Sequence, residues 1–270
     1  MGKKIQDRVK ILATSDLHGE LDGLASEAAW ADILCISGDI QPAVIGIDTK
    51  AWFVNVFFPF VSKLSCEVVA ICGNHDFVLA SALGCGYGGW LAENAPSNFH
   101  LLMDEAITLN GLTFYGTPWC PTIDGRWCFE KDDEELADLF MQMPKDVDVL
   151  LTHTPPKGNG KRGGALDVSL QNGNSRHFGS DSLLAALKEK TPHVMFCGHI
   201  HSGDHAGMLL DGKEHNTLVV NVSRLDEKYR PTYKCRRMVF TGKAIADFGE
   251  ERGEIRRGMT AATGGGIGYN

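Results

Sequence analysis

The sequence lacks the features of an exported, membrane-spanning or disulfide-stabilised protein. Its eight cysteines form no Cys-x-x-Cys pair, and Cys35, Cys72 and Cys197 stand in or beside apolar runs, where small buried thiols are common. We therefore expect reduced thiols and a cytoplasmic location, because disulfide frameworks are favoured in short secreted chains. The first apolar run, residues 9–13, is too short for a secretory signal and far shorter than the roughly 20 residues that span a bilayer. We expect a soluble protein that is not exported and has no membrane partner.

The chain also lacks an excess of positive charge. It contains 26 Lys and Arg residues against 34 Asp and Glu residues, which gives a formal net charge of -8 at pH 7. General binding of nucleic acid depends on an excess of basic side chains over the binding surface. The composition therefore disfavours a general nucleic-acid binder, and a local basic cleft remains open as an alternative.

No Pro-rich or Ser-rich linker and no internal repeat divides the 270 residues. With 43% hydrophobic and 22% charged residues, the chain has the composition of one large globular domain. We predict a single domain over residues 1–249. Residues 250–270 mix charged residues with a Gly-rich end, and we predict that they form a weakly ordered tail.

Short apolar runs rich in β-branched residues alternate with helical patterns along the chain. The runs are residues 9–14, 33–37, 68–72, 113–116, 147–152 and 194–197, and we predict that they form buried strands. The helical patterns lie at residues 21–30, 49–64, 132–141 and 181–190. This alternation predicts an α/β fold whose sheet is covered by helices. Shorter extended segments at residues 208–210, 218–222 and 237–240 predict a second sheet that closes the fold.

The predicted helix at residues 49–64 contains an aromatic stripe. Phe53, Phe57, Phe60, Val61 and Leu64 recur with helical spacing, so we predict that this face packs in the core and does not hold a cofactor. Pro59 lies inside the same pattern and should kink or shorten the helix.

Side chains that bind metals in other proteins follow five of the predicted strands. The segments are Asp16-Leu17-His18-Gly19, Gly38-Asp39, Gly73-Asn74-His75-Asp76, His153, and Gly198-His199-Ile200-His201. In open α/β sheets, ligands bind beyond the carboxyl ends of the strands. We therefore expect these side chains to meet at one end of the sheet.

The residue types predict a metal centre. Asp-x-His and His-x-His place two side chains on the same side of an extended segment. Carboxylate, imidazole and amide groups form a mixed nitrogen and oxygen set that suits Mn, Fe, Zn or Co. The candidate ligands are Asp16, His18, Asp39, Asn74, His153, His199 and His201. They are too many for one four-coordinate zinc ion, and two metals that share a bridging carboxylate account for the number.

In this order the motifs resemble those of the calcineurin-like metallophosphoesterases, which are D-x-H, G-D, G-N-H-[DE], a lone H and G-H-x-H. The segments FYGTPW at residues 114–119, LTHTPP at 151–156 and GHIH at 198–201 are similar to the branch called metallophosphoesterase-domain-containing proteins. The resemblance implies a four-layer α/β/β/α sandwich with two packed mixed β-sheets, of the metallo-dependent phosphatase type. Each residue alone could be an ordinary turn, cap or surface residue, but the ordered set favours the metal centre.

The resemblance also implies how the ligands divide between two metals. One ion would take Asp16, His18, Asp39 and His201, and the other Asp39, Asn74, His153 and His199, with Asp39 as the bridge. Two divalent ions outweigh the charge of two carboxylates and a bridging hydroxide by about one unit, which favours an anionic substrate. Such a centre lowers the pKa of the bridging water and holds phosphoryl oxygens for in-line attack.

His75 is the remaining imidazole of the Gly-Asn-His-Asp motif. We assign it to stabilising the transition state and protonating the leaving oxygen, with Asp76 orienting its ring. Asp76 has an alternative role as the N-cap of the segment that follows. His100, His177, His193, His205 and His215 fit no motif position, and we expect surface or structural roles for them.

Two regions are candidates for substrate binding. Residues 155–179 form a long segment rich in Gly and Asn that contains Lys157, Lys161, Arg162 and Arg176. We expect either a cationic lid over the phosphate or a solvated loop. Trp119, Trp127 and Tyr87 are candidate walls for base stacking, but for the two tryptophans we favour packing in the core.

The function that these observations favour is hydrolysis of small phosphoesters, in particular phosphodiesters such as cyclic or other small nucleotides, as the branch resemblance implies. The alternatives are a phosphomonoesterase and a metal-binding scaffold without catalysis. The protein-phosphatase subgroup has G-D-x-x-D-R-G and R-G-N-H-E, whereas this chain has GDIQP at residues 38–42 and CGNHD at 72–76. The missing Asp and Arg disfavour the monoesterase. Net charge disfavours a nuclease that acts on long DNA.

Overall fold

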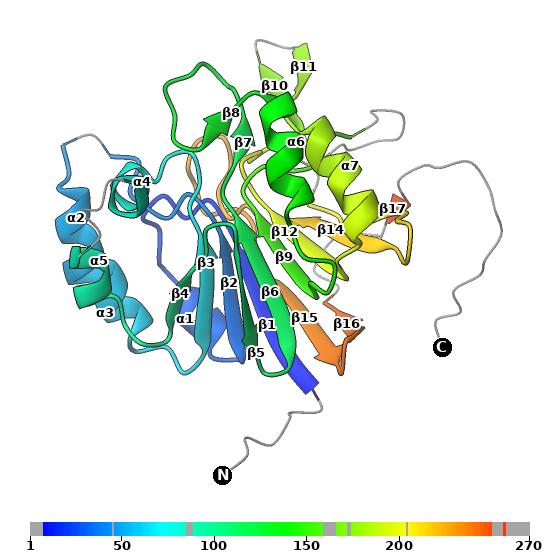
Figure 1. Ribbon diagram of the computed structural model, residues 1–270. Helices are drawn as coiled ribbons and strands as arrows, with labels where there is room; N and C mark the ends of the chain where they lie inside the picture. The colour runs from blue at the N-terminus through cyan, green and yellow to red at the C-terminus, as the bar shows by residue number, and fades with distance from the viewer. Residues whose placement is uncertain are drawn as a thin grey trace.

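Two β-sheets packed face to face form the centre of the molecule, with helices over both outer faces (Figure 1). The computed structural model describes residues 8–44, 46–84, 89–158, 166–171, 174–203, 205–249 and 256–257. Tyr87, Lys161 and Arg162 lie outside the described residues, as does most of the predicted tail at 250–270.

The first sheet has six strands in the order β16-β15-β1-β2-β3-β4. The strands β1 (Arg8–Thr14), β2 (Ile33–Ser37), β3 (Glu67–Ile71) and β4 (Phe99–Leu101) are parallel, and β15 (Arg236–Thr241) and β16 (Ala244–Phe248) complete the sheet in antiparallel pairs. On its outer face lie α1 (Leu24–Ala28), α2 (Thr49–Trp52), a π-helix η1 (Phe53–Phe57), α3 (Phe58–Val61), α4 (Phe77–Gly84) and α5 (Gly89–Asn94).

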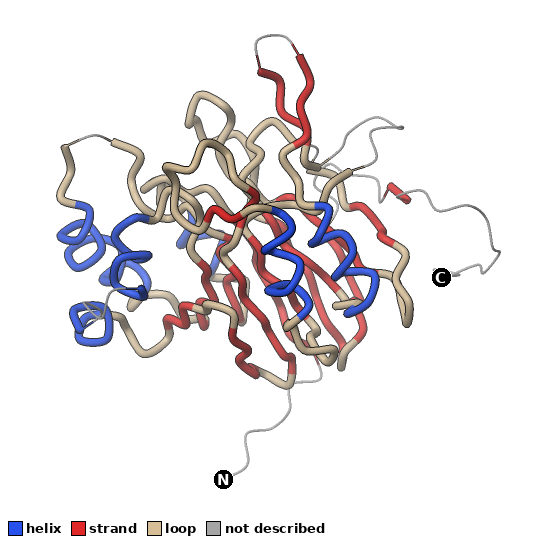
Figure 2. Tube along the Cα trace, turned by 45° about the horizontal axis from the view of Figure 1, so that its top comes forward, coloured by secondary structure: helices blue, strands red, loops and turns tan. Residues whose placement is uncertain are grey.

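The second sheet has seven strands in the order β17-β13-β14-β12-β9-β6-β5. Their bounds are β5 (Glu105–Leu109), β6 (Leu112–Thr117), β9 (Val149–Thr152), β12 (Val194–Cys197), β13 (Met208–Leu210), β14 (Thr217–Asn221) and β17 (Arg256–Arg257). The helices α6 (Asp133–Met141) and α7 (Asp181–Lys190) cover it. Two small ribbons, β7 (Cys120–Pro121) with β8 (Glu130–Lys131) and β10 (Val168–Gln171) with β11 (Asn174–His177), lie outside the sheets (Figure 2).

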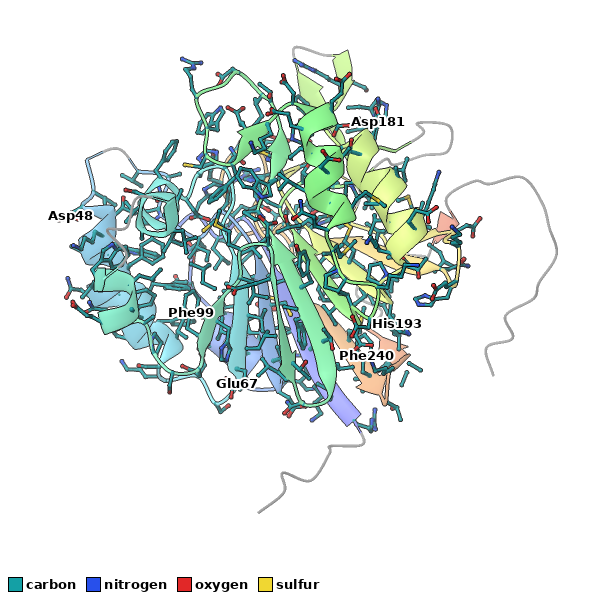
Figure 3. The ribbon with its side chains drawn as sticks, in the orientation of Figure 1. Asp48, Glu67, Phe99, Asp181, His193 and Phe240 are labelled. Carbon is teal, nitrogen blue, oxygen red and sulfur yellow. The ribbon has the colours of Figure 1, made fainter. Side chains whose placement is uncertain are left out.

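Alternating side chains of the central strands build three apolar layers. In β1, Ile11 packs between the two sheets with Phe196 of β12, whereas its neighbour Leu12 packs under the helices with Phe57. A third layer joins the second sheet to α6 and α7. Figure 3 marks Phe240, which belongs to the layer between the sheets, and Phe99, which lies under the helices. A strand buried on both faces needs apolar residues throughout, which is why the continuous apolar runs of the sequence form these strands. The predicted four-layer arrangement is confirmed.

The assignment of strands to sheets differs from the prediction. Of the late extended segments, β13 and β14 join the second sheet as expected, but β15 pairs with β1 in the first. The earlier strands β6, β9 and β12 also lie in the second sheet. The chain therefore changes sheets after β4, before β15 and again between β16 and β17, which the local pattern of apolar residues does not encode.

The helix predicted over residues 49–64 ends at Val61 and is built from α2, η1 and α3. Phe53, Phe57 and Val61 are buried, as the stripe predicted. The wider π-helical turn ends at Phe57, and Pro59 lies in the first turn of α3, where the lack of an N–H is tolerated. The sequence predicted a kinked or shortened helix, and the structure has a helix that contains a π-helical turn and ends at Val61.

The described cysteines carry free thiols, and all but Cys128 are buried. Among the helices that the structure describes, none has the length and apolar character needed to span a bilayer.

Candidate metal centre

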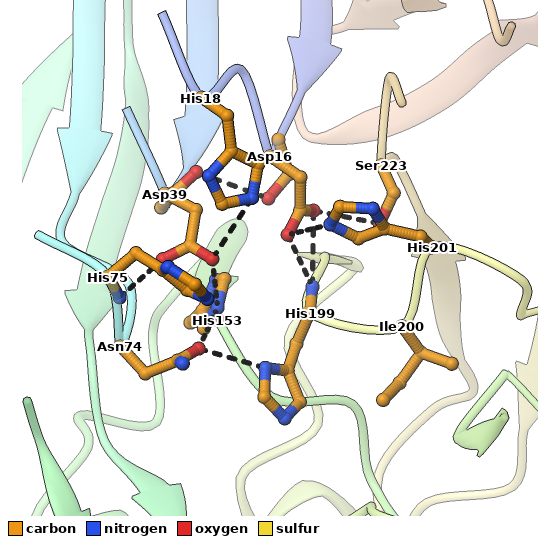
Figure 4. Close-up of polar contacts among 12 residues, drawn as sticks. Asp16, His18, Asp39, Asn74, His75, His153, His199, Ile200, His201 and Ser223 are labelled. Carbon is orange, nitrogen blue, oxygen red and sulfur yellow. Dashed lines mark hydrogen bonds and ion pairs between the residues drawn. The ribbon is translucent and has the colours of Figure 1, made fainter. Parts of the chain in front are cut away.

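The seven side chains predicted as metal ligands lie in one cluster (Figure 4). They follow strands of both sheets: Asp16 and His18 follow β1, Asp39 follows β2, Asn74 follows β3, His153 follows β9, and His199 and His201 follow β12. Backbone hydrogen bonds join the loops that carry them. His18 N donates to the carbonyl of Asp39 at 2.9 Å, and Gly198 N donates to the carbonyl of His153 at 3.0 Å.

One group of ligand atoms comes from Asp16, His18 and His201, each offering an atom within 4.8 Å of the others. His201 Nδ1 lies 3.0 Å from the carbonyl oxygen of Asp226, so Nδ1 carries a proton and donates it. In the neutral imidazole this leaves the lone pair on Nε2, which lies 3.3 Å from Asp16 Oδ1. Ser223 Oγ donates to Asp16 Oδ2 at 2.8 Å and fixes the carboxylate.

A second group comes from Asp16, Asp39 and His153, again with ligand atoms within 4.8 Å of one another. His153 Nδ1 donates to the carbonyl of Ser37 at 2.9 Å, so its Nε2 faces the cluster. That atom lies 3.4 Å from Asp39 Oδ2 and 2.9 Å from Asn74 Oδ1. Electron pairs that converge in this way repel one another unless a proton or a metal cation lies among them.

Asn74 connects the second group to the remaining predicted ligand. Its Oδ1 lies 3.0 Å from His199 Nδ1 as well as 2.9 Å from His153 Nε2. Asn74 therefore stands between two imidazoles, where an amide oxygen completes a mixed nitrogen and oxygen donor set.

His18 tests whether these residues fit a metal. Both of its ring nitrogens are buried and have no hydrogen-bond partner in the described structure, and its Nε2 lies 3.5 Å from Asp39 Oδ2. A buried polar atom without a partner is costly and rare. A divalent cation among these donors would give the imidazole its missing partner, so the residues fit the metal that the motifs imply.

Two carboxylates lie where a bridging ligand could stand. The two groups of ligand atoms share Asp16, whereas the motif resemblance names Asp39 as the bridging ligand. Asp39 Oδ2 nevertheless lies 3.5 Å from His18 Nε2 and 3.4 Å from His153 Nε2, between one imidazole of each implied set. The bridging role of Asp39 stays a prediction.

Burial and charge hold most of these groups in the state that a metal requires. Burial would raise the pKa of Asp16 and of Asp39, but the facing imidazoles hold both pKa values below the usual range. Burial lowers the pKa of His18 to about 4 and that of His199 to about 3. Burial also acts downward on His153, but the charge of Asp39 raises its pKa to about 9. The carboxylate of Asp16 likewise raises the pKa of His201 to about 9. Two carboxylates are thus anionic beside the neutral imidazoles of His18 and His199, an arrangement that attracts cations.

The backbone of the cluster is unusual. Asp16, His18, Asp39 and His199 have positive φ values of 53°, 44°, 53° and 69°. Residues other than glycine rarely adopt this conformation, and when they do they are concentrated at functional sites. The strain turns each loop sharply after its strand, so that the side chains face one another.

Residues 9–203 match the family of calcineurin-like phosphoesterases. The chain belongs to this family. The match covers all seven predicted ligands and confirms the resemblance stated from the motifs. The centre is therefore the buried Asp and His metal-binding cluster of a calcineurin-like phosphoesterase.

Individual relatives agree with the family assignment. UPF0046 protein T07D4.2 of Caenorhabditis elegans is 30% identical over 222 residues, which cover 73% of this chain and 52% of that protein. The chain thus spans about half the length of that relative. Metallophosphoesterase domain-containing protein 1 of Homo sapiens is 26% identical over 242 residues, which cover 82% of this chain and 68% of that protein.

Solved structures share the fold. The crystal structure of TT1561 of Thermus thermophilus superposes with a TM-score of 0.54 and 15% identity, over 90% of this chain and 99% of that one. Another crystal structure superposes with a TM-score of 0.59 and 19% identity, over 86% of this chain and 95% of that one.

His75 lies beside the cluster. Its backbone N–H donates to Asp39 Oδ1 at 2.9 Å, and its half-buried ring lies 4.9 Å from the ring of His18 and 4.4 Å from that of Trp127. This position is compatible with the predicted contact to a leaving group, which stays a prediction.

Asp76 differs from the prediction that it orients the ring of His75. Its carboxylate accepts hydrogen bonds from the backbone N–H groups of Ile40 at 2.9 Å, Gln41 at 2.9 Å and Gly73 at 2.8 Å. These donors precede it in the chain, so the side chain joins the loops after β2 and β3. Burial and the charge of Asp39 raise the pKa of Asp76 to about 7.

The predicted substrate residues occupy other positions. Lys157 forms an ion pair with Asp181 at the start of α7, and the guanidinium of Arg176 lies 5.1 Å from the ring centre of Phe178. Part of the segment expected to be a loop forms the β10–β11 hairpin (Figure 2). Arg162 lies outside the described residues. A substrate role for these three residues stays a prediction.

The aromatic candidates separate into two kinds. Trp119 donates its indole N–H to Asp104 Oδ2 at 2.7 Å and packs against Phe129, which is the packing role favoured for it. Trp127 instead lies next to His75. Tyr229 was not among the predicted residues, and its ring lies 4.7 Å from that of His18.

Two further residues were not predicted: Ser223, whose hydroxyl holds Asp16, and Asp226, whose carbonyl holds His201. Ser223 comes two residues after the end of β14. The rule that functional residues follow parallel strands could have found it, whereas Asp226 and Tyr229 belong to no motif.

Proposed function

We propose that this chain is a metal-dependent phosphoesterase and that its substrates are phosphodiesters of small nucleotides, cyclic nucleotides included. The observation that carries the proposal is the buried cluster in which carboxylates, an amide and imidazoles turn their electron pairs toward one another. Divalent cations held there would attract an anionic phosphate although the chain as a whole has a net charge of -8.

We infer that the cluster holds two ions from the set Mn, Fe, Zn and Co, because the donors combine nitrogen with oxygen. When bound, the ions supply the Lewis acidity that phosphoester hydrolysis requires. The chain supplies the orientation. Ser223 and the backbone N–H of His199 fix the carboxylate of Asp16, and the backbone N–H of His75 fixes that of Asp39.

His75 is the group that we assign to the leaving oxygen. Its ring is half-buried, stands against His18 and Trp127, and is held at the cluster by its own backbone hydrogen bond to Asp39. A proton on this imidazole can pass to the oxygen that departs, a step that typically contributes about 10² to 10⁴ in rate.

The preference for diesters rests on the branch that the motifs resemble and on the missing motif residues of the monoesterase subgroup. A human relative carries the name metallophosphoesterase domain-containing protein 1, which is the branch that the motifs resemble. The segments at residues 38–42 and 72–76 lack the second Asp and the Arg of the protein-phosphatase subgroup.

The test is turnover by the purified chain loaded with manganese. We expect a larger kcat/KM for bis-p-nitrophenyl phosphate than for p-nitrophenyl phosphate, and about two metal ions per chain by elemental analysis. A decisive advantage for the monoester would reject the diesterase assignment. A metal-loaded protein without turnover of either ester would reject the enzyme and favour the scaffold.

His75→Ala tests the assigned proton donor. We expect turnover to fall by about 10² or more while metal content stays unchanged. His100→Ala is the matched control, because His100 lies on β4 and pairs with Glu67 at the start of β3, away from the cluster. Unchanged turnover in His75→Ala would reject this role.

A further inference from the structure

A row of rings runs along the metal cluster. The ring of Tyr229 lies 4.7 Å from that of His18, which lies 4.9 Å from that of His75, which lies 4.4 Å from that of Trp127. Beyond Trp127, at 6.1 Å, stands the ring of Phe77. Tyr229 thus contacts His18 of the cluster, and Trp127 contacts His75, which lies beside the cluster.

Tyr229 is held in place by a strained loop that is tied to the cluster. Its φ is 58°, a conformation that a bulky residue keeps only when its surroundings impose it. Its N–H donates to the carbonyl of Asp226 at 2.8 Å, and that same carbonyl accepts the hydrogen bond from His201 Nδ1 at 3.0 Å. The Asp226 carboxylate also accepts from the N–H groups of Lys228 and Arg230. The side chain of Tyr229 nevertheless remains 47% exposed.

Trp127 is positioned in the same manner from the other side. The N–H of the next residue, Cys128, donates to the carbonyl of Asn74 at 3.1 Å, so the loop is tied to a predicted ligand. The N–H of Trp127 donates to Glu130 Oε2 at 3.0 Å. The ring is only half-buried, and the neighbouring Phe77 is 43% exposed.

We propose that Tyr229 and Trp127 determine substrate specificity by packing against a planar aromatic group of the phosphoester, a nucleobase or an aryl ring. The proposal rests on the proposed function of the same site. Rigid aromatic side chains left partly exposed beside a polar cluster are typical walls of a ligand site. Because every base has a π-face, such walls accept planar groups and discriminate against ligands without them.

Equilibrium binding tests this selection without depending on turnover. Isothermal titration calorimetry of the manganese-loaded chain would compare adenosine 5′-phosphate, phenyl phosphate and ribose 5-phosphate, which share a phosphate monoester and differ in the planar group. Since stacking of a base is worth about 1–3 kcal/mol, we expect adenosine 5′-phosphate to bind about tenfold more tightly than ribose 5-phosphate. If phenyl phosphate binds as tightly as adenosine 5′-phosphate, the two aromatic walls accept any planar ring. If phenyl phosphate binds more weakly, the walls select a nucleobase.

The variants Tyr229→Leu and Trp127→Leu keep apolar bulk and remove the ring. We expect each to weaken binding of adenosine 5′-phosphate by roughly tenfold and to leave ribose 5-phosphate unchanged, while Tyr229→Phe retains the preference. Trp30→Leu is the control, because Trp30 precedes β2 at the end of the sheet opposite the cluster.

Three results would overturn the proposal. The first is a wild-type chain that binds adenosine 5′-phosphate no more tightly than ribose 5-phosphate. The second is a set of Leu variants that keep the wild-type difference in affinity between these two ligands. The third is an equal loss of affinity for both ligands in the variants together with lost manganese, which would show a packing role. Failure of phosphoester hydrolysis is a separate result, because the binding comparison remains measurable in a chain that does not turn over bis-p-nitrophenyl phosphate.

Discussion

Residues without a side chain allow the two sheets to approach each other closely at the metal cluster. Gly198 follows β12 of the second sheet, and a Cβ added there would lie 2.0 Å from Ser15 Oγ and 2.3 Å from Asp16 Oδ2 of the first. The next residue, His199, donates its N–H to the carboxylate of Asp16. Only glycine permits this approach, so the glycine of the Gly-His-x-His motif serves the geometry of the ligands that follow it.

Gly198→Ala should therefore push Asp16 away from its metal-binding position. We expect the free energy of unfolding to fall by about 1–3 kcal/mol through overpacking, and bound manganese to be lost. Urea denaturation and elemental analysis measure the two effects. Gly84→Ala is the control, because an added Cβ there meets no atom within 4 Å. Full metal content in Gly198→Ala would show that the loop can yield without moving the carboxylate.

Asp76 illustrates a carboxylate whose role is structural in the first instance. Asp76→Ala would leave the buried N–H groups of Ile40, Gln41 and Gly73 without their acceptor, and each unsatisfied donor costs about 1–3 kcal/mol. We expect a loss of stability well above that of Asp48→Ala, which removes the exposed cap of α2 at a cost of about 1 kcal/mol. Denaturant titrations of the two variants measure the loss in the free energy of unfolding. If the two losses were equal, water would replace the Asp76 carboxylate as the acceptor for these N–H groups.

At the scale of elements, the sequence predicts what lies within a strand and misses what joins strands. Ile33–Ser37 and Val194–Cys197 have the predicted bounds, because a strand buried on both faces is apolar at every position. The pairing of β15 with β1 joins residues more than 200 positions apart and leaves no local pattern. The short helices α4 and α5 were not predicted either, because neither has a distinct apolar stripe that would mark it as a helix.

The same division applies to the site. The seven predicted ligands could be found because each follows a strand and its residue type is unusual there. Tyr229 could not, because its neighbours His18 and His201 approach it only through folding. The sequence does not show where the Asp76 side chain points, because its direction is decided by hydrogen bonds to the loop after β2.

Besides their apolar contact, α6 and α7 are joined at one end by the side chain of Asp133. Asp133, in the first turn of α6, accepts hydrogen bonds from the N–H of Ser182 at 2.9 Å and from the hydroxyl of Ser180. Ser180 in turn caps α7 by accepting from the N–H of Leu183 at 2.9 Å. One carboxylate thus connects the start of one helix to the cap of the other.

Asp133→Ala should loosen this contact. We expect a loss of about 2 kcal/mol in the free energy of unfolding, because a hydrogen bond to a charged group contributes about 1.5–3 kcal/mol. Glu134→Ala provides the matched control, since Glu134 lies in the same first turn but is exposed and should change stability by under about 0.5 kcal/mol. Chemical denaturation of both would contradict the assignment if the two variants were equally stable.

Over the whole molecule, the metal cluster joins the two sheets. Asp16, Asp39 and Asn74 come from the ends of strands in the first sheet, and His153 and His199 from strands in the second. The apolar layer between the sheets is continuous beneath them. A cation that binds this cluster binds both sheets together, and it does so only when they are packed. Metal binding and folding must therefore be linked.

Manganese should raise the free energy of unfolding in proportion to the logarithm of its concentration. At a free concentration 100 times Kd, one site contributes about 2.7 kcal/mol, and removal of the metal with a chelator should reverse the gain. His18→Ala removes a ligand whose ring nitrogens have no other partner in the described structure, so this variant should lose most of the gain. His100→Ala, which alters an imidazole paired with Glu67 away from the cluster, should keep all of it. Urea titrations with and without manganese measure each difference. If His18→Ala kept the full gain, the stabilising ions would be bound elsewhere, and the cluster would not be what holds the sheets together.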